Sequence, residues 1–412
     1  MFMTEYNLIQ LDNGIRILLH HQNSPITHCC LIVNAGSRIE QEGKFGMAHF
    51  IEHLLFKRTE KRSTSQILNR IEQVGGDLNA YTTKEYTCIH ASFLNPYLER
   101  AMDLFEDVLF HSTFPAHELE KEKSVILDEI ASYADSPEES IMDDFEDMLF
   151  QGSGLGHNIL GLEDDLKSLS RTDVLHFIQQ AYHTDEIIIA ISGDYSLKQV
   201  EKLSQKIFGH IPSNTTPRHH ETVQLRPSEH RIIKKPINQA HYMIGAQLFG
   251  YFDERKMSML LLNNLLGGMG MSSILNLGIR EKYGIAYTIE SNFTMYSDVG
   301  NFSIYLGTDE EKLPKAIKLV QKELQKLRDQ PLSGLQLQRA KQKFKGQIAL
   351  AEENRMSMII AEAKNILDYN RVVTLAEVFT KIDEVRAEDI QALAVEFFDP
   401  QRLLSLSFVP ED

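Results

Sequence analysis

The sequence repeats itself at an interval of about half its length. Residues 65–69 (Ser-Gln-Ile-Leu-Asn) recur as residues 272–276 (Ser-Ser-Ile-Leu-Asn), 207 positions later. Residues 80–82 (Ala-Tyr-Thr) recur as residues 286–288 at a separation of 206. A strand-like run precedes each copy, at residues 29–35 and 241–248. Two nearly equal separations favour duplication over coincidence, so we expect two copies of one domain fold.

The length of 412 residues also exceeds what one typical domain needs. Between the two copies, the stretch Pro212-Ser-Asn-Thr-Thr-Pro217 is polar and rich in turn-forming residues, which is typical of a linker. We therefore expect a first domain at residues 1–212, a linker at 213–231 and a second domain at 232–412. Four histidines lie in or near the linker: His210, His219, His220 and His230. No helical or hairpin spacing organises them, so we interpret them as solvated linker residues and not as a metal-binding tract.

Strand-like and helical patterns alternate within each half, which is typical of an α+β sandwich, here repeated twice. In the first half, Asp12-Asn13-Gly14 predicts the turn of a hairpin over 6–20. Further strands are expected at 27–35, 78–82 and 86–93, and helices at 46–56, 65–74, 96–110 and 115–134.

Composition excludes several classes of protein. The net charge of −16, from 58 acidic and 42 basic residues, leaves no basic footprint for nucleic acid. No apolar run has transmembrane length and the first residues do not resemble a signal peptide, so we expect no membrane partner. Three cysteines, Cys29, Cys30 and Cys88, lack Cys-x-x-Cys spacing, which argues against a disulfide framework and a thiolate zinc site. A reducing cytoplasmic location is the resulting expectation.

The segment His49-Phe-Ile-Glu-His53 is the most informative for chemistry. On a helix, residues four apart share a face, so His49 and His53 can present two imidazoles to one ion. Glu52 flanks the same face. Imidazole suits zinc, and a catalytic zinc takes three protein ligands and a water. The alternative for this pattern alone is a pair of packed or solvent-facing histidines.

A third ligand is expected to be a carboxylate from another helix, and residues 118–129 offer several. Glu122 and Glu129 are two helical turns apart and so share a face. A run of Glu and Lys is more often a solvated helix surface. The apolar neighbours of Glu129 (Val125, Ile126 and Ile130) suggest that it is buried, and a buried carboxylate needs a partner such as a metal.

The order His-x-x-Glu-His is inverted relative to the usual zinc peptidase motif and marks the inverzincins. The chain resembles the pitrilysin family, which includes insulin-degrading enzyme and the mitochondrial processing peptidase. The resemblance extends over essentially the whole chain and rests on three blocks: residues 35–40 (Ala-Gly-Ser-Arg-Ile-Glu), 46–56 (Gly-Met-Ala-His-Phe-Ile-Glu-His-Leu-Leu-Phe) and 75–81 (Gly-Gly-Asp-Leu-Asn-Ala-Tyr). It implies one Zn²⁺ per chain with Glu129, 76 residues after His53, as third ligand. It further implies that Glu52 is the general base and that Glu122 supports a ligand from outside the coordination sphere.

The second half resembles the family's other signature, Gly278-Ile-Arg-Glu-Lys-Tyr-Gly-Ile-Ala-Tyr287. The resemblance implies that Arg280 and Tyr287, seven apart, contact substrate and assist catalysis. At the repeat separation, Lys256 and Leu260 replace the two histidines, and Gln347 stands opposite Glu129. We therefore expect the second domain to keep the fold without the metal.

The resemblance implies a zinc metalloendopeptidase that acts on peptides or unfolded segments inside a closed chamber. Asn79 and Ala80 would bind extended substrate through main-chain contacts. Since single-chain relatives build the chamber from four such domains, a homodimer of this chain would rebuild it. Two departures leave substrate preference open: Phe56-Lys57-Arg58-Thr59, where relatives often have Phe-Lys-Gly-Thr, and an irregular glycine-rich segment at 267–271.

Two alternatives remain at this stage. One is a non-catalytic core or scaffold subunit of the same fold, which has no need of the complete set His49, Glu52, His53 and Glu129. The other is a peptidase that requires a distinct partner subunit. One chain here carries both the zinc motif and the Arg/Tyr pair, which makes a homodimer the more economical hypothesis.

Overall fold

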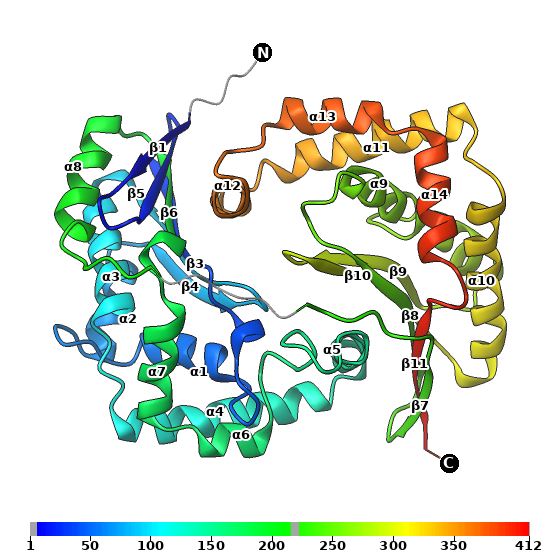
Figure 1. The fold of residues 1–412 in the computed structure, drawn as a ribbon, viewed down its shortest axis with the longest axis horizontal. Coiled ribbons are helices and arrows are strands. Elements are labelled where there is room, and N and C mark those ends of the chain that lie inside the picture. Colours follow the sequence, from blue (N-terminus) through cyan, green and yellow to red (C-terminus); the bar gives the residue numbers. More distant parts are fainter. Residues whose placement is uncertain (1–5, 216–221, 412) are drawn as a thin grey trace. The chain divides into compact units, whose positions relative to one another are not determined.

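The computed structural model describes residues 6–215 and 222–411 (Figure 1). These residues form two compact units, each assembled from three stretches of the chain. The first unit contains residues 6–130, 158–215 and 350–374, and the second contains residues 131–157, 222–349 and 375–411. The expected linker at 213–231 includes residues 216–221, which lie outside the described residues. His219 and His220 belong to this range. Strand β7 begins at His230, inside the range expected as linker.

The first unit holds a six-stranded mixed sheet with helices. The elements expected from the sequence are present and agree within two residues at each end. In chain order, this unit comprises β1 (Tyr6–Gln10), β2 (Arg16–His21), β3 (Ile26–Val33), η1 (Ser37–Ile39), α1 (Met47–Leu55), α2 (Thr64–Glu72), β4 (Asp77–Thr82), β5 (Thr87–Leu94), η2 (Asn95–Tyr97), α3 (Leu98–Phe110), most of α4 (Ala116–Ala134), α6 (Glu163–Ser168), α7 (Arg171–Ala181), η3 (Thr184–Glu186), β6 (Ile187–Gly193), α8 (Leu197–Phe208) and α12 (Arg355–Tyr369).

The second unit holds a five-stranded mixed sheet, also with helices. It comprises α5 (Pro137–Leu149), β7 (His230–Lys235), β8 (Ala240–Phe249), α9 (Lys256–Leu266), the π-helix η4 (Asn276–Glu281), β9 (Thr288–Met295), β10 (Val299–Thr308), η5 (Glu310–Lys312), α10 (Leu313–Asp329), most of α11 (Gly334–Ala351), α13 (Leu375–Glu384), α14 (Ala387–Phe397) and β11 (Leu404–Pro410).

The two sheets share one topology, which supports the duplication inferred from the sequence. The first has the order β1-β2-β6-β3-β5-β4 and the second β7-β11-β8-β10-β9. Without β1, the strands correspond one for one. In both sheets the first pair is parallel, β2 with β6 and β7 with β11, and the remaining pairs are antiparallel. The α+β class with two mixed sheets is confirmed, and β4 and β9 are the corresponding edge strands.

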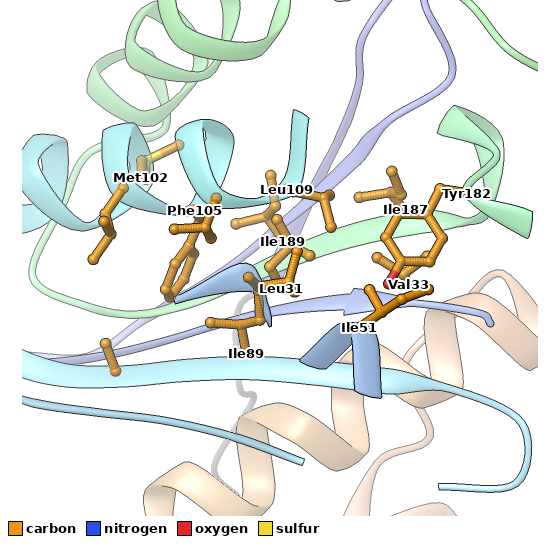
Figure 2. Packing of buried hydrophobic residues seen from close by; sticks show 14 of the residues in the cluster. Leu31, Val33, Ile51, Ile89, Met102, Phe105, Leu109, Tyr182, Ile187 and Ile189 are labelled. Atoms are coloured by element: carbon orange, nitrogen blue, oxygen red, sulfur yellow. The ribbon is translucent and has the colours of Figure 1, made fainter. Parts of the chain in front are cut away.

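One face of the first sheet packs against helices from the same half of the sequence. Its central strands alternate between two buried faces, and Leu31 of β3 and Ile189 of β6 face this layer. Figure 2 shows side chains of α3, among them Phe105 and Leu109, against these strand residues. Phe105, Leu31 and Ile189 have no exposed surface. Burial of apolar area on this scale is the main source of folding free energy.

The other face of each sheet is covered by a helix from the opposite half of the sequence. In the first unit, Ile359, Ala363 and Ile366 of α12 pack against strand residues that include Cys30 and Ile188. In the second unit, α5 packs in the same manner through Ile141, Phe145, Met148 and Leu149 against β8, β10 and β11. Each compact unit therefore contains one helix from the opposite half of the sequence. A single domain boundary in the sequence does not describe this arrangement.

The three cysteines lie inside the first unit. Cys29 packs on the α3 side of the sheet and Cys30 on the α12 side, as alternation along a strand requires. All three, including Cys88, are buried free thiols. Among the described helices, none combines the length and the apolar character that a bilayer crossing requires.

Helix α12 is expected to be essential for the stability of the first unit. Ile359 has no exposed surface, so Ile359→Ala should lower the free energy of unfolding by about 2–5 kcal/mol through lost burial and a residual cavity. Leu175→Ala on α7, where the side chain is 39% exposed, is the matched control and should cost less than about 1 kcal/mol. Urea unfolding followed by circular dichroism measures both. Equal effects of the two substitutions would contradict the packing role of α12.

Candidate metal centre

Helix α1 is oriented by its apolar side. Six of its nine residues are buried: Met47, Ala48, Phe50, Ile51, Leu54 and Leu55. Their spacing leaves His49, Glu52 and His53 partly accessible on the remaining face, as the sequence predicts. The helix thus places three polar side chains together because its other positions are committed to the core.

The start of α1 is fixed by a buried carboxylate and a glycine. Glu40, 8% exposed, accepts hydrogen bonds from the backbone N–H groups of Gly46 at 2.8 Å and Ala48 at 2.7 Å. These are N-terminal helix groups without intrahelical partners, so a carboxylate there satisfies them and complements the helix dipole. Gly46 has φ of +90°, and a Cβ atom there would lie 2.6 Å from the Leu160 carbonyl oxygen. Both features fix where α1 begins and therefore where its two histidines lie.

His49 and His53 are brought together with Glu129 of α4. Their imidazole centroids lie 4.6 Å apart. The Oε2 atom of Glu129 is 3.9 Å from His49 Nε2 and 3.7 Å from His53 Nε2. These separations are too long for hydrogen bonds. Two ligands of a tetrahedral zinc ion lie about 3.3 Å apart, so the three donor atoms are nearly placed to share one ion.

The orientation of His53 is set by Glu122, which lies two turns before Glu129 on the same face of α4. Glu122 Oε2 lies 3.3 Å from His53 Nδ1, and Glu122 Oε1 is 2.6 Å from the ammonium group of Lys57. With Nδ1–H donated to the carboxylate, the lone pair of Nε2 is directed toward Glu129. A carboxylate behind a ligating histidine is the usual arrangement at protein zinc sites. The residues therefore fit the ion by donor chemistry as well as by distance.

One expectation about α4 is wrong. The apolar pattern suggested that Glu129 is buried, but its side chain is 42% exposed, and Val125 is exposed as well. The buried carboxylate of this helix is Glu122, at 2%. The helix turns Ile126 into the core, and Glu129 lies at the rim of that face. Exposure of Glu129 leaves its oxygen accessible for coordination.

Burial sets the protonation states around the centre. Burial and the neighbouring imidazole of His53 lower the pKa of His49 to about 4, so its ring is neutral near pH 7 as metal binding requires. Burial also raises the pKa of Glu52, an effect that the hydrogen bond from Thr82 partly offsets. The Thr82 hydroxyl donates to Glu52 Oε2 at 2.6 Å. Glu52 is thus held beside the metal donors but is not one of them.

Lys57 and Thr82 are site residues that sequence reasoning missed. Lys57 lies two residues beyond the end of α1, and its closeness to the motif in sequence could have drawn attention to it. Thr82 reaches Glu52 from β4, and only the packing of α1 against that strand reveals it.

Asn79 and Ala80 lie on β4, the edge strand of the first sheet. An edge strand has one row of backbone N–H and C=O groups without a strand partner, which can pair with an extended peptide. The Asn79 side chain itself accepts a hydrogen bond from the Ala80 N–H at 2.8 Å. Thr82 on the same strand bonds Glu52, so the free edge begins next to the candidate centre.

Arg280 and Tyr287 belong to the second unit, where both line a pocket of about 540 Å³ with Asn263 and Asn264. Among the described residues, the guanidinium of Arg280 has no hydrogen-bond or ion-pair partner. Tyr287 is 54% exposed and donates to Asp309 Oδ1 at 2.9 Å, which raises its pKa. An arginine without an anionic partner in a polar pocket can bind a carbonyl or carboxylate group.

The second unit has no counterpart of the metal centre at the repeated positions. Lys256 is the first residue of α9, and Gln347 lies in α11. The Gln347 side chain accepts a hydrogen bond from Asn264 at 2.7 Å and donates to the Met269 carbonyl at 2.9 Å. An amide thus occupies the position that Glu129 has in the first unit, with its polar atoms already bonded.

The chain matches two family models, one after the other along the sequence. Residues 16–163 match the model of the insulinase family, peptidase family M16, and residues 168–344 match the model of the peptidase M16 inactive domain. An uncharacterized zinc protease of Bacillus subtilis, YmxG, is 33% identical over 403 residues, which cover 96% of both chains. The chain belongs to the insulinase family of peptidases, M16.

Other M16 relatives include the mitochondrial-processing peptidase subunit beta of Rattus norvegicus, 29% identical over 94% of this chain and 81% of the relative. Among solved structures, a protease from Helicobacter pylori superposes with a TM-score of 0.90 at 20% identity, covering 99% of this chain and all of the other. The M16 inactive-domain structure from Pseudomonas fluorescens gives 0.90 at 21%, covering 99% of this chain and 98% of that one. These structures establish the shared fold.

The candidate ligands make a direct prediction about metal content. His49→Ala and His53→Ala should each lose the zinc ion of this centre, measured as a loss of one zinc per chain by elemental analysis of protein dialysed at pH 7. Glu122→Gln should weaken zinc binding by roughly 10–100-fold, because it removes the support of His53 without removing a ligand. His176→Ala, an exposed position on α7, is the matched control and should keep its zinc. Full zinc content in Glu129→Gln would contradict Glu129 as third ligand.

Proposed function

We propose that this M16 chain is a zinc metalloendopeptidase that hydrolyses peptides or unfolded polypeptide segments. The observation that carries the proposal is the arrangement in the first unit. Nε2 atoms of His49 and His53 converge with a carboxylate oxygen of Glu129, and a different carboxylate, Glu52, stands beside them. Relatives over almost the whole chain are named zinc proteases, which supports the same function.

The role of each residue follows from its position. His49, His53 and Glu129 would hold the zinc ion, which when bound would supply a Lewis acid for the scissile carbonyl and for a water molecule. Glu52 accepts a proton from the attacking water and delivers it to the leaving amine. Burial raises the pKa of Glu52, which brings a carboxylate closer to the range in which it exchanges protons near neutral pH. Thr82 keeps its second oxygen in place.

The substrate binds in an extended conformation along β4. Main-chain pairing at Asn79 and Ala80 aligns the peptide with the centre, because the edge strand continues to Thr82, which contacts Glu52. Pairing through the main chain selects for an accessible, extended backbone more than for particular side chains. Folded domains cannot supply such a segment, whereas short peptides and unfolded regions can.

Arg280 and Tyr287 complete the reaction from a second copy of the chain. Arg280 binds a substrate carbonyl or carboxylate, and Tyr287 donates a hydrogen bond to the developing oxyanion, an interaction worth about 2–4 kcal/mol. To do so, Tyr287 must release Asp309, because a hydroxyl has one proton to donate. The assembly is a homodimer that encloses substrate in a chamber. A scaffold role would leave the Glu52–Thr82 and His53–Glu122–Lys57 contacts without a purpose.

Glu52→Gln tests the general base. The amide cannot accept the proton, so the rate of peptide hydrolysis should fall by roughly 10²–10⁴-fold while zinc content stays at the wild-type value. Hydrolysis of a mixed peptide library followed by mass spectrometry, with and without chelator, measures the rate. A Thr82→Val variant, which keeps the carboxylate and removes only its hydroxyl partner, should show a smaller loss. Near wild-type turnover by Glu52→Gln would overturn the assignment.

Complementation between inactive variants tests catalysis across the homodimer. Glu52→Gln and Tyr287→Phe, mixed under conditions of subunit exchange, should regain about a quarter of wild-type activity, because half of the dimers then carry one intact site of two. Mixing Glu52→Gln with His49→Ala is the matched control. Both substitutions lie in the first unit, so no dimer restores a site and activity should stay at the parental level. Confirmed mixed dimers without any gain would show that each chain completes its own site.

A further inference from the structure

The first unit contains a second group of two histidines and a glutamate, which shares no residue with the candidate centre. Glu106 lies in α3, His111 directly follows that helix, and His210 follows α8. Donor atoms of all three lie within 4.8 Å of one another. From its sequence context His210 was expected to be a solvated linker histidine, because no helical or hairpin spacing relates it to the other histidines near the linker.

Glu106 is the focus of this group. Its side chain is 3% exposed, and Oε1 lies 2.7 Å from His111 Nε2 and 3.3 Å from His210 Nε2. Neighbouring ligands of a tetrahedral zinc ion lie about 3.3 Å apart, so the Glu106–His210 separation already fits and His111 must move away by about half an ångström. His111 follows the last turn of α3 and its side chain is 26% exposed, so a rotation of the ring suffices.

The lysine beside Glu106 contacts the carboxylate oxygen that the two histidines do not. Lys61 approaches the other oxygen of Glu106, Oε2, at 3.4 Å, and its own side chain is 51% exposed. Glu60 Oε2 lies 3.8 Å from His111 Nδ1, which is too long for a hydrogen bond, and the Glu60 side chain is 71% exposed. Glu106 and His210 also line a surface pocket of about 650 Å³. Its other charged lining residues are Glu99, Asp103, Lys61, Arg62, Arg70, Arg100 and Lys206.

The backbone on both sides of His210 is held in place, while the imidazole itself is 58% exposed. The side-chain amide of Asn13 donates to the carbonyl oxygens of Phe208 at 2.8 Å and Ile211 at 3.0 Å. Asn13 is buried, so these two bonds fix the backbone around the imidazole. A fixed backbone on one side and a buried carboxylate in a helix on the other lower the entropic cost of bringing the donors to one ion.

We propose that Glu106, His111 and His210 form a second metal site, which ties the end of α3 to the residues after α8. Two imidazoles and one carboxylate select a zinc-class transition ion over Mg²⁺ or Ca²⁺, which take oxygen ligands. The site links segments far apart in sequence and lies on elements separate from α1 and α4. Its role is structural, because a bound ion stabilises the folded chain that presents all three ligands.

Zinc stoichiometry of four full-length proteins tests the site independently of the proposed peptidase function. After dialysis against excess magnesium, wild type should retain two zinc ions, His49→Ala/His53→Ala one, His111→Ala/His210→Ala one and the combined variant none. Cobalt substitution adds a spectroscopic check, since His49→Ala/His53→Ala should still show d–d absorption that the combined variant lacks. His117→Ala, at an exposed position, is the histidine control and should retain two ions.

Thermal unfolding separates loss of the ion from loss of the fold. Zinc should raise the Tm of His49→Ala/His53→Ala. This zinc-induced shift should vanish in the combined variant. It should shrink when Glu106→Gln, which preserves the shape of the side chain, is added to His49→Ala/His53→Ala. One zinc in wild type with none in His49→Ala/His53→Ala would overturn the second site. One zinc in wild type that is lost only from His111→Ala/His210→Ala would instead contradict the catalytic centre.

Discussion

Both faces of both sheets are apolar, and the architecture depends on covering them. The central strands β3 and β6 are buried on each side, so helices on one face alone would leave residues such as Ile32 and Ile188 in water. The chain meets this requirement by exchange: α12 covers the first sheet and α5 the second. The exchange also bears on the candidate centre, because α4, which carries Glu122 and Glu129, continues into the segment that leads to α5. Glu129, the candidate third ligand, therefore lies near the point where the chain passes from the first unit to the second.

The duplicated sheets show how one fold can carry different chemistry at equivalent places. Strand order and direction are the same, and an edge strand, β4 or β9, closes each sheet. The first unit places imidazoles and carboxylates beside this edge. The second has Lys256 and Gln347 at the repeated positions, and Gln347 is committed to Asn264 and to a backbone carbonyl. What the second unit offers instead is Arg280, a cation without an anionic partner among the described residues. Duplication preserved the packing pattern, which depends on apolar spacing, and left the polar positions free to diverge.

Local patterns predicted the elements and the core of the site, and long-range contacts limited the rest. The spacing of His49 and His53 was sufficient to place them on one helical face, because the remaining positions of α1 are apolar. The apolar neighbours of Glu129 were misleading, since burial of a helix face extends to Ile126 and leaves Glu129 at its rim. Thr82 and the cluster around Glu106 could not be found, because the sequence does not show which distant residues meet. Helix exchange was missed for the same reason: a periodic apolar stripe shows that a helix is buried but not against which sheet.

The two His–His–Glu groups differ in how the protein holds the donors apart. At the candidate centre, His53 is bonded through Nδ1 to Glu122, and Glu122 in turn to Lys57, so the nitrogen facing Glu129 stays separated from it by 3.7 Å. Around Glu106 no such chain acts on His210, and the carboxylate bonds His111 directly at 2.7 Å. An ion entering the first group finds its ligands spaced for coordination, whereas one entering the second must first replace a hydrogen bond. Since the cost of rearrangement subtracts from affinity, an ion would bind the group on α1 and α4 at a lower cost than the group around Glu106.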